Sequence, residues 1–72
     1  MTREENILIN QIINSVDWYK SLGYKFTDEY ILSQINYQTN NLVENINLDT
    51  DRIDFDEVQK VIAEYYGITI ED

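Results

Sequence analysis

The sequence predicts a small all-α domain of three helices. Apolar side chains recur at helical spacing in three segments, residues that favour helix caps stand between these segments, and proline is absent. The chain of 72 residues has room for one hydrophobic core only. We therefore expect a single helical domain over residues 1–72.

The first helix is expected to run from about Arg3 to Leu22. Gly23 follows it and supplies a natural C-cap, because glycine tolerates the left-handed conformation required there. Ile7, Trp18 and Leu22 lie on the face opposite the main apolar stripe, so this helix is either sandwiched within the fold or in contact with a partner. The main stripe consists of Ile9, Ile12, Ile13, Val16 and Tyr19.

The second helix is expected to start after Thr27, a favourable N-cap residue that is followed by two acids in the first turn. Its apolar stripe is the most regular of the chain and predicts packing along the whole length of the helix. Two heptads are too few to indicate a coiled coil. The stripe consists of Leu32, Ile35, Thr39, Leu42 and Ile46, flanked by Ile31 and Val43.

The third helix should begin at Asp54, which together with Glu57 has the form of a capping box, and it should end at Gly67. Apolar and polar residues alternate at 24–26 and at 68–70, a pattern compatible with a minor two-stranded β pairing of these segments. The apolar stripe of the helix consists of Phe55, Val58, Ile62 and Tyr65, with Val61 and Tyr66 at its edges.

Composition excludes several kinds of chemistry. The chain has neither cysteine nor histidine, which removes tetrahedral zinc sites, Cys–His or Ser–His–Asp catalysis and thiol redox reactions. Catalysis by paired carboxylates requires one carboxyl group in an apolar cleft, and a chain of this size offers no evident cleft. We therefore expect a non-enzymatic protein without a cofactor.

The net charge of −9 is unevenly distributed. Residues 44–72 carry nine acids and two bases, whereas residues 1–43 carry five acids and three bases. Such a field repels nucleic acids and anionic membranes and attracts basic surfaces, so we expect a basic protein partner and no direct nucleic-acid or membrane binding. No apolar run approaches 18 residues, and the N-terminus lacks the features of a signal peptide, which favours a cytoplasmic location.

The segment 49–60, DTDRIDFDEVQK, is the most acidic part of the chain. An EF-hand alignment with Glu57 at the twelfth position fails, because Ile46 and Leu48 then occupy ligand positions and the required glycine is missing. A looser calcium or magnesium cluster remains an alternative. Its ligands would be Asp49, Asp51, Asp54 and Asp56.

Helix electrostatics explain only part of this charge. Asp54, Asp56 and Glu57 complement the helix dipole, whereas the acids outside the first turn of the helix have no such explanation. The C-terminal acids therefore form either a merely solvated surface or a partner-binding surface. The candidate surface consists of Glu44, Asp49, Asp51, Asp54, Asp56, Glu57, Glu64, Glu71 and Asp72.

Carboxylates three or four residues apart on a helix stand about 5–6 Å from each other, a spacing comparable to that of DNA phosphates. In size, acidity, lack of cysteine and helical character the whole chain resembles small phage-encoded inhibitors that act as DNA mimics against host DNA-handling proteins, such as sliding-clamp inhibitors. The resemblance lies in charge layout rather than in a residue motif. It implies a viral protein in the host cytoplasm that blocks the basic DNA-binding surface of a replication protein.

Two alternatives use the same acidity. An antitoxin, immunity or regulatory protein would neutralise one basic partner without excluding DNA, and a divalent-metal-binding domain would use the aspartates of 49–56. Trp18, Tyr30 and Tyr37 are candidate interface aromatics, since tyrosine and tryptophan are enriched at protein interfaces. A core of this size without disulfides favours a homodimer.

Overall fold

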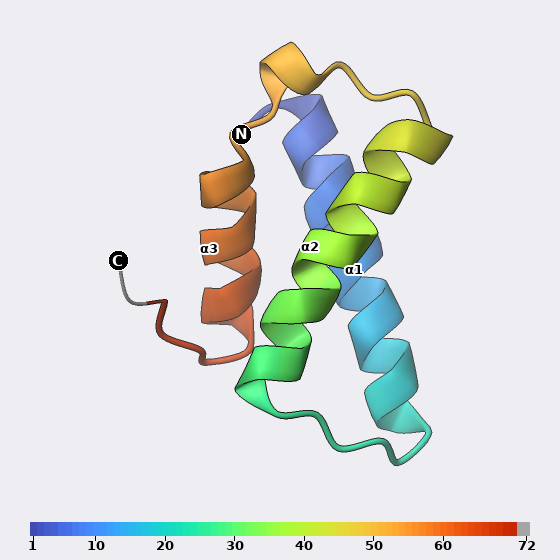
Figure 1. Cartoon of the computed structure of the whole chain (residues 1–72), viewed down its shortest axis with the longest axis vertical. Coiled ribbons are helices and arrows are strands. Elements are labelled where there is room, and N and C mark those ends of the chain that lie inside the picture. The colour runs from blue at the N-terminus through green and yellow to red at the C-terminus, as the bar shows by residue number, and fades with distance from the viewer. Residues whose placement is uncertain (71–72) are drawn as a thin grey trace.

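The structure is a computed structural model that describes residues 1–70. Its elements are α1 (Arg3–Ser21), α2 (Asp28–Asn45), the short 3-10 helix η1 (Thr50–Arg52) and α3 (Phe55–Tyr65). The prediction of an all-α domain with three helices is confirmed. Each helix packs against both others, and α2 runs opposite to α1 and α3 (Figure 1). The starts of α1 and α3 therefore meet the end of α2 at one end of the bundle.

A side-chain oxygen caps the start of each α-helix. The predicted N-caps Thr27 and Asp54 are confirmed, since they accept the backbone N–H groups of Tyr30 and Glu57. The cap of α1 is Thr2, which forms a complete capping box with Glu5. These caps satisfy backbone donors that would otherwise lack a partner in the first turn of each helix.

All three helices end in the same left-handed turn. Gly23 and Gly67 have φ angles of +94° and +71°, which confirms the two predicted glycine stops. At α2 the corresponding residue is Asn47, with a φ of +53°. The N–H group of Leu48 donates to the carbonyl of Val43 at 3.2 Å and closes this turn. Asparagine is the residue that most often replaces glycine in this role.

The core lies on the axis between the three helices. Leu8, Ile12, Ile35, Val58 and Ile62 are its largest fully buried side chains. Each predicted stripe contributes to the core but also contains residues that the structure exposes to solvent: Tyr19 of α1, Ile46 at the C-cap of α2, and Phe55 and Tyr65 of α3.

These four residues stand near the ends of their helices, where the neighbouring helices no longer cover them. Leu8 and Ala63, which the stripes did not include, are fully buried in their place. On helix α1, Trp18 and Leu22 are 58% and 57% exposed, so this part of the helix is not sandwiched within the fold.

Residues 1–70 contain no strand, so the suggested pairing of 24–26 with 68–70 is not formed. Ile68 is buried in the core and Ile70 packs against it, while the Phe26 ring stacks between Tyr24 and Tyr30. Over the same residues, no helix combines the length and apolar character that crossing a membrane requires.

Candidate functional site

At one end of the bundle α1 and α3 start and α2 stops (Figure 1). Most of the acidic residues belong to the segments that meet at this end. Eight of the fourteen acids lie there, together with Arg3 and Arg52, two of the five bases. We call this region the acidic end. Its acids are Glu4, Glu5, Glu44, Asp49, Asp51, Asp54, Asp56 and Glu57.

Six of the nine predicted surface acids belong to the acidic end, and all six are exposed. Glu64 lies in the last turn of α3, at the opposite end of the bundle. Glu71 and Asp72 fall outside the described residues. Sequence reasoning missed Glu4 and Glu5, although the Thr2-x-x-Glu5 pattern of a capping box marked the start of α1.

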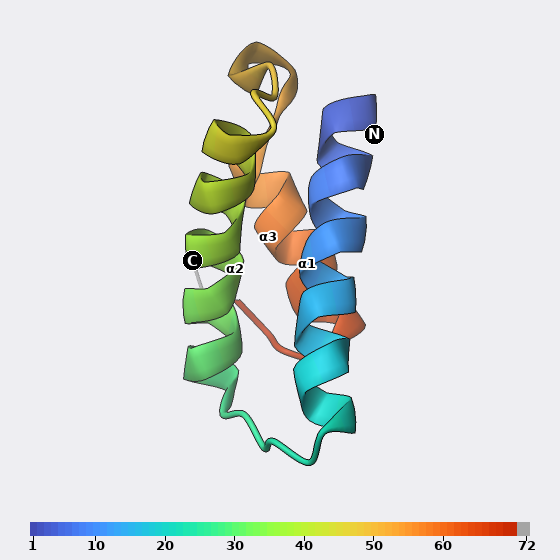
Figure 2. The same ribbon diagram turned by 90° about the vertical axis from the view of Figure 1, so that its right-hand side faces the viewer.

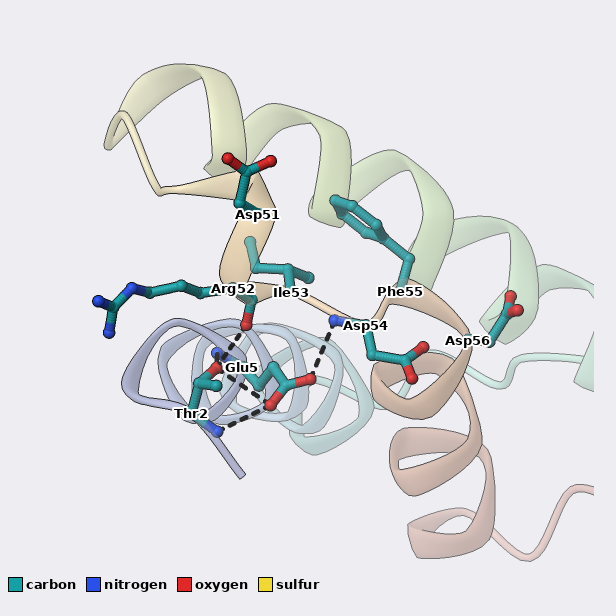
Figure 3. A pocket seen from close by; sticks show the side chains of 8 residues that line it. All are labelled: Thr2, Glu5, Asp51, Arg52, Ile53, Asp54, Phe55 and Asp56. Atoms are coloured by element: carbon teal, nitrogen blue, oxygen red, sulfur yellow. Dashed lines mark hydrogen bonds between the residues drawn. The ribbon is translucent and has the colours of Figure 1, made fainter.

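Glu5 connects the starts of α1 and α3. One carboxylate oxygen accepts the Thr2 N–H at 2.7 Å, and the other accepts the Asp54 N–H at 3.0 Å (Figure 3). These hydrogen bonds, that of Thr2 first, lower the pKa of Glu5 below its ordinary value of 4.5. In the predicted capping box the Asp54 N–H would donate to the Glu57 carboxylate. It donates to Glu5 instead, so the Glu57 carboxylate is not used to cap α3.

The loop before α3 holds its aspartates in fixed turns. Asp49 and Asp54 each accept a backbone N–H at 3.1 Å, from Asp51 and Glu57 respectively. Among the acids of residues 1–70, Arg52 pairs with Asp49 alone, at 3.7 Å, and its side chain points away from Asp54 and Asp56 (Figure 3). The loop therefore keeps its carboxylates exposed with little compensation from nearby positive charge.

Glu4 has an unusual environment beside this loop. Its side chain is only 10% exposed, and within the described part of the chain its Oε2 atom is buried without a hydrogen-bond partner. The Arg3 guanidinium stands 3.9 Å from Oε1, too far for a hydrogen bond. An open cavity of about 430 Å³ adjoins it. Its lining is Arg3, Glu4, Ile7, Gln11, Ile46, Asn47, Leu48 and Asp49.

Among residues 1–70, no three Asp or Glu side chains converge in a way that could hold a metal ion. Asp49, Asp51, Asp54 and Asp56, the ligands of the metal alternative, thus do not form such a group. Asp49 and Asp54 instead use a carboxylate oxygen to accept a backbone N–H.

The predicted interface aromatics lie away from the acidic end, and all three are exposed: Trp18 at 58%, Tyr30 at 46% and Tyr37 at 60%. They belong to a larger surface that sequence reasoning did not assemble, which we call the aromatic face. It consists of Trp18, Tyr19, Leu22, Tyr24, Phe26, Tyr30 and Tyr37.

Five rings of the aromatic face form a continuous row of contacts, in the order Trp18, Tyr19, Tyr24, Phe26 and Tyr30. Ring centroids are 5.1 Å apart for Trp18 and Tyr19, 6.0 Å for Tyr19 and Tyr24, and 4.8 Å for Phe26 and Tyr30. A groove of about 310 Å³ runs beside the row, lined only by α1, α2 and the loop between them. These two helices stand in front of α3 in Figure 2.

No protein-family model matches this chain, and neither a curated protein nor a solved structure is significantly similar to it.

Proposed function

We propose that the protein is a non-enzymatic inhibitor that covers the basic, DNA-contacting surface of a partner protein with its acidic end. The observation that supports this most directly is the gathering of six exposed carboxylates, from three separate segments, at one end of a small bundle. A field of this kind steers association with a basic surface and raises the rate of encounter.

Helix dipoles do not cancel this charge. The starts of α1 and α3 each contribute about half a positive charge, and the end of α2 contributes about half a negative charge. The sum is roughly +0.5, whereas the acids exceed the bases of the acidic end by six formal charges. The field at this end is therefore strongly negative.

Asp54 and Glu57 are three residues apart at the start of α3, a separation that places side chains on a helix about 5–6 Å from each other. Phosphates of duplex DNA supply one negative charge per about 1.7 Å of helix axis, counted over both strands. A groove whose Lys and Arg side chains bind such a dense row of charges can also accept a set of closely placed carboxylates. The fixed turns at Asp49 and Asp54 reduce the entropy lost when these carboxylates are ordered by a partner.

The cavity beside Glu4 provides a second contact for a basic partner. The Glu4 carboxylate has already lost most of its water, and among residues 1–70 Oε2 has no hydrogen-bond partner. A Lys or Arg side chain that enters the cavity would supply the missing hydrogen bonds, and such charge-assisted bonds are stronger than neutral ones. Arg3 is 81% exposed and can move aside.

The test begins with affinity capture of a partner from a bacterial lysate, followed by competition between this protein and duplex DNA for the captured partner. We expect mutual exclusion and an affinity that falls with salt, because exposed charge pairs are screened over about 8–10 Å. Joint replacement of Asp51, Asp56 and Glu57 by Asn or Gln should lower the association rate and leave the helices intact.

The matched control replaces the same number of acids at the opposite end of the bundle, with Asp28→Asn, Glu29→Gln and Glu64→Gln combined, since all three residues are exposed. It should leave the association rate nearly unchanged. A partner that binds the protein and DNA together, with neither affinity altered, would exclude the DNA mimic and favour an immunity or regulatory protein. Equal loss of association rate in both variants would mean that total charge, rather than the acidic end, drives binding.

A further inference from the structure

From the aromatic face we infer that a second copy of this chain is the partner of that surface, so that the protein is a dimer with its two acidic ends pointing apart. This inference is independent of the proposed inhibition, because it concerns the isolated protein. It follows from the exposed area, the shape and the charge of the face.

The exposed area is large for a monomer of this size. Six side chains of the face are between 44% and 60% exposed. Since an aromatic side chain buries about 150–250 Å² when fully covered, the five aromatic side chains among them, each about half exposed, offer roughly 500 Å². That lies in the upper part of the range for the largest apolar patch on a typical monomer, about 300–600 Å². With its polar rim, the face approaches the roughly 800 Å² per partner of a standard interface. The six are Trp18, Tyr19, Leu22, Tyr24, Tyr30 and Tyr37.

The shape of the face is suited to a symmetric contact. Trp18 is exposed next to Tyr19 but does not line the groove, whereas Tyr37 and Gln34 line the groove from α2. The same face therefore carries an exposed ring outside the groove and a hollow that can receive such a ring. A two-fold contact requires this kind of self-complementary surface, because each copy presents the same patch to the other.

The charge of the region also fits a second copy. Lys25 lies in the loop between α1 and α2, next in sequence to Phe26 of the face, and Asp28 and Glu29 follow it, so both signs are present there. Lys20 and Asp17 instead contact Tyr66 of α3. A strongly basic partner would be drawn to the acidic end instead. The molecule is 34 Å long, several times the Debye length of about 8 Å. In a dimer that forms through the aromatic face, the two acidic ends therefore lie far enough apart for salt to screen their repulsion.

Trp18 is the only tryptophan of the chain and reports directly on this contact. Sedimentation equilibrium should give about twice the chain mass of 8.6 kDa. On dilution the Trp18 emission maximum should move to longer wavelength, over the same concentration range in which sedimentation shows the dimer dissociating. Added salt should leave the dimer intact or strengthen it, because the contact is mainly apolar.

Tyr37→Glu should yield a folded monomer, since Tyr37 is 60% exposed and its loss removes no core contact. Phe55→Glu is the matched control, an exposed aromatic at the acidic end, and it should remain dimeric. Two results would overturn the inference: a monomer at every concentration with solvent-exposed Trp18, or a dimer that Tyr37→Glu leaves intact. A monomer whose Trp18 fluorescence responds to a proline-rich peptide would assign the face to a foreign partner.

Discussion

The Glu5 carboxylate accepts the backbone N–H of Asp54, a residue 49 positions further along the chain, at 3.0 Å. Thr2 strengthens the same junction, because its hydroxyl donates to the Arg52 carbonyl at 2.7 Å. The start of α1 thereby holds the loop that carries the exposed aspartates. The positions of the exposed aspartates therefore depend on Thr2 and Glu5, although neither of these two residues is itself exposed.

Glu5→Gln should lower the melting temperature at neutral pH, because the amide lacks the charge that strengthens the bonds to Thr2 and Asp54. The folded-state pKa of Glu5 lies below its ordinary value of 4.5. Its contribution to stability is therefore present above pH 4.5 and is lost as the pH falls through the folded-state pKa. Thermal melts of both proteins at decreasing pH should converge.

Glu29→Gln serves as the control for this experiment. Glu29 is an exposed first-turn acid of α2, so its replacement removes the same formal charge without a tertiary hydrogen bond. A difference between wild type and Glu5→Gln that stays constant into acid would contradict the role assigned to the Glu5 carboxylate.

Thr2→Ala should destabilise the protein more than Thr27→Ala. Both residues cap a helix, and loss of a cap costs about 1 kcal/mol. Thr2 additionally binds the carbonyl of Arg52, whereas Thr27 makes no comparable long-range bond in the described part of the chain. We expect urea unfolding to show about 1 kcal/mol of extra loss for Thr2→Ala. Equal losses would mean that the bond to Arg52 contributes nothing to stability.

Stability should also fall in alkali. Burial, followed by a hydrogen bond to Asp17, raises the pKa of Tyr66 above its ordinary value of 10.0. Since the folded state retains this proton more tightly, the contribution is present below pH 10 and is lost as the pH rises through the folded-state pKa. Urea midpoints should decline less steeply above pH 10 for Tyr66→Phe than for wild type, whereas the exposed control Tyr37→Phe should follow wild type.

The sequence was sufficient to predict the helices because their signals are local. Thr27, Asp54 and the two glycines act within one turn, and the structure places helix starts and ends at them. Exposure was harder to predict, because it depends on where neighbouring helices end. Phe55 follows the apolar period of α3 but occupies its first position, beyond full cover by α1 and α2.

The acidic end was predicted only in part for the same reason. The run of aspartates is contiguous in sequence, whereas Glu4 and Glu5 join it through the up-and-down arrangement of the helices. Tyr19 and Tyr65 were assigned to apolar stripes, yet a tyrosine ring can pack while its hydroxyl stays in water or reaches a partner. Tyr65 does the latter and binds Asp17 at 3.1 Å.

The two neighbouring glutamates at the start of α1 should respond to substitution in opposite directions. Both carboxylate oxygens of Glu5 accept hydrogen bonds, whereas Oε2 of Glu4 is buried without a partner in the part of the chain that the structure describes. An unsatisfied buried polar group costs about 1–3 kcal/mol, and the favourable interaction of an acid with the helix dipole returns only about 0.3–1 kcal/mol. Glu4→Met retains an unbranched side chain of similar length and removes the buried charge.

We therefore expect Glu4→Met to raise the free energy of unfolding by about 1 kcal/mol in urea, while Glu5→Gln lowers the melting temperature. The same Glu4→Met protein should bind the captured partner more weakly than wild type, because the cavity no longer offers a carboxylate to a Lys or Arg side chain. A group that destabilises the free protein and strengthens the complex is typical of a binding residue. If Glu4→Met instead destabilises the isolated protein, Glu4 supports the fold, and the contact proposed at this cavity is wrong.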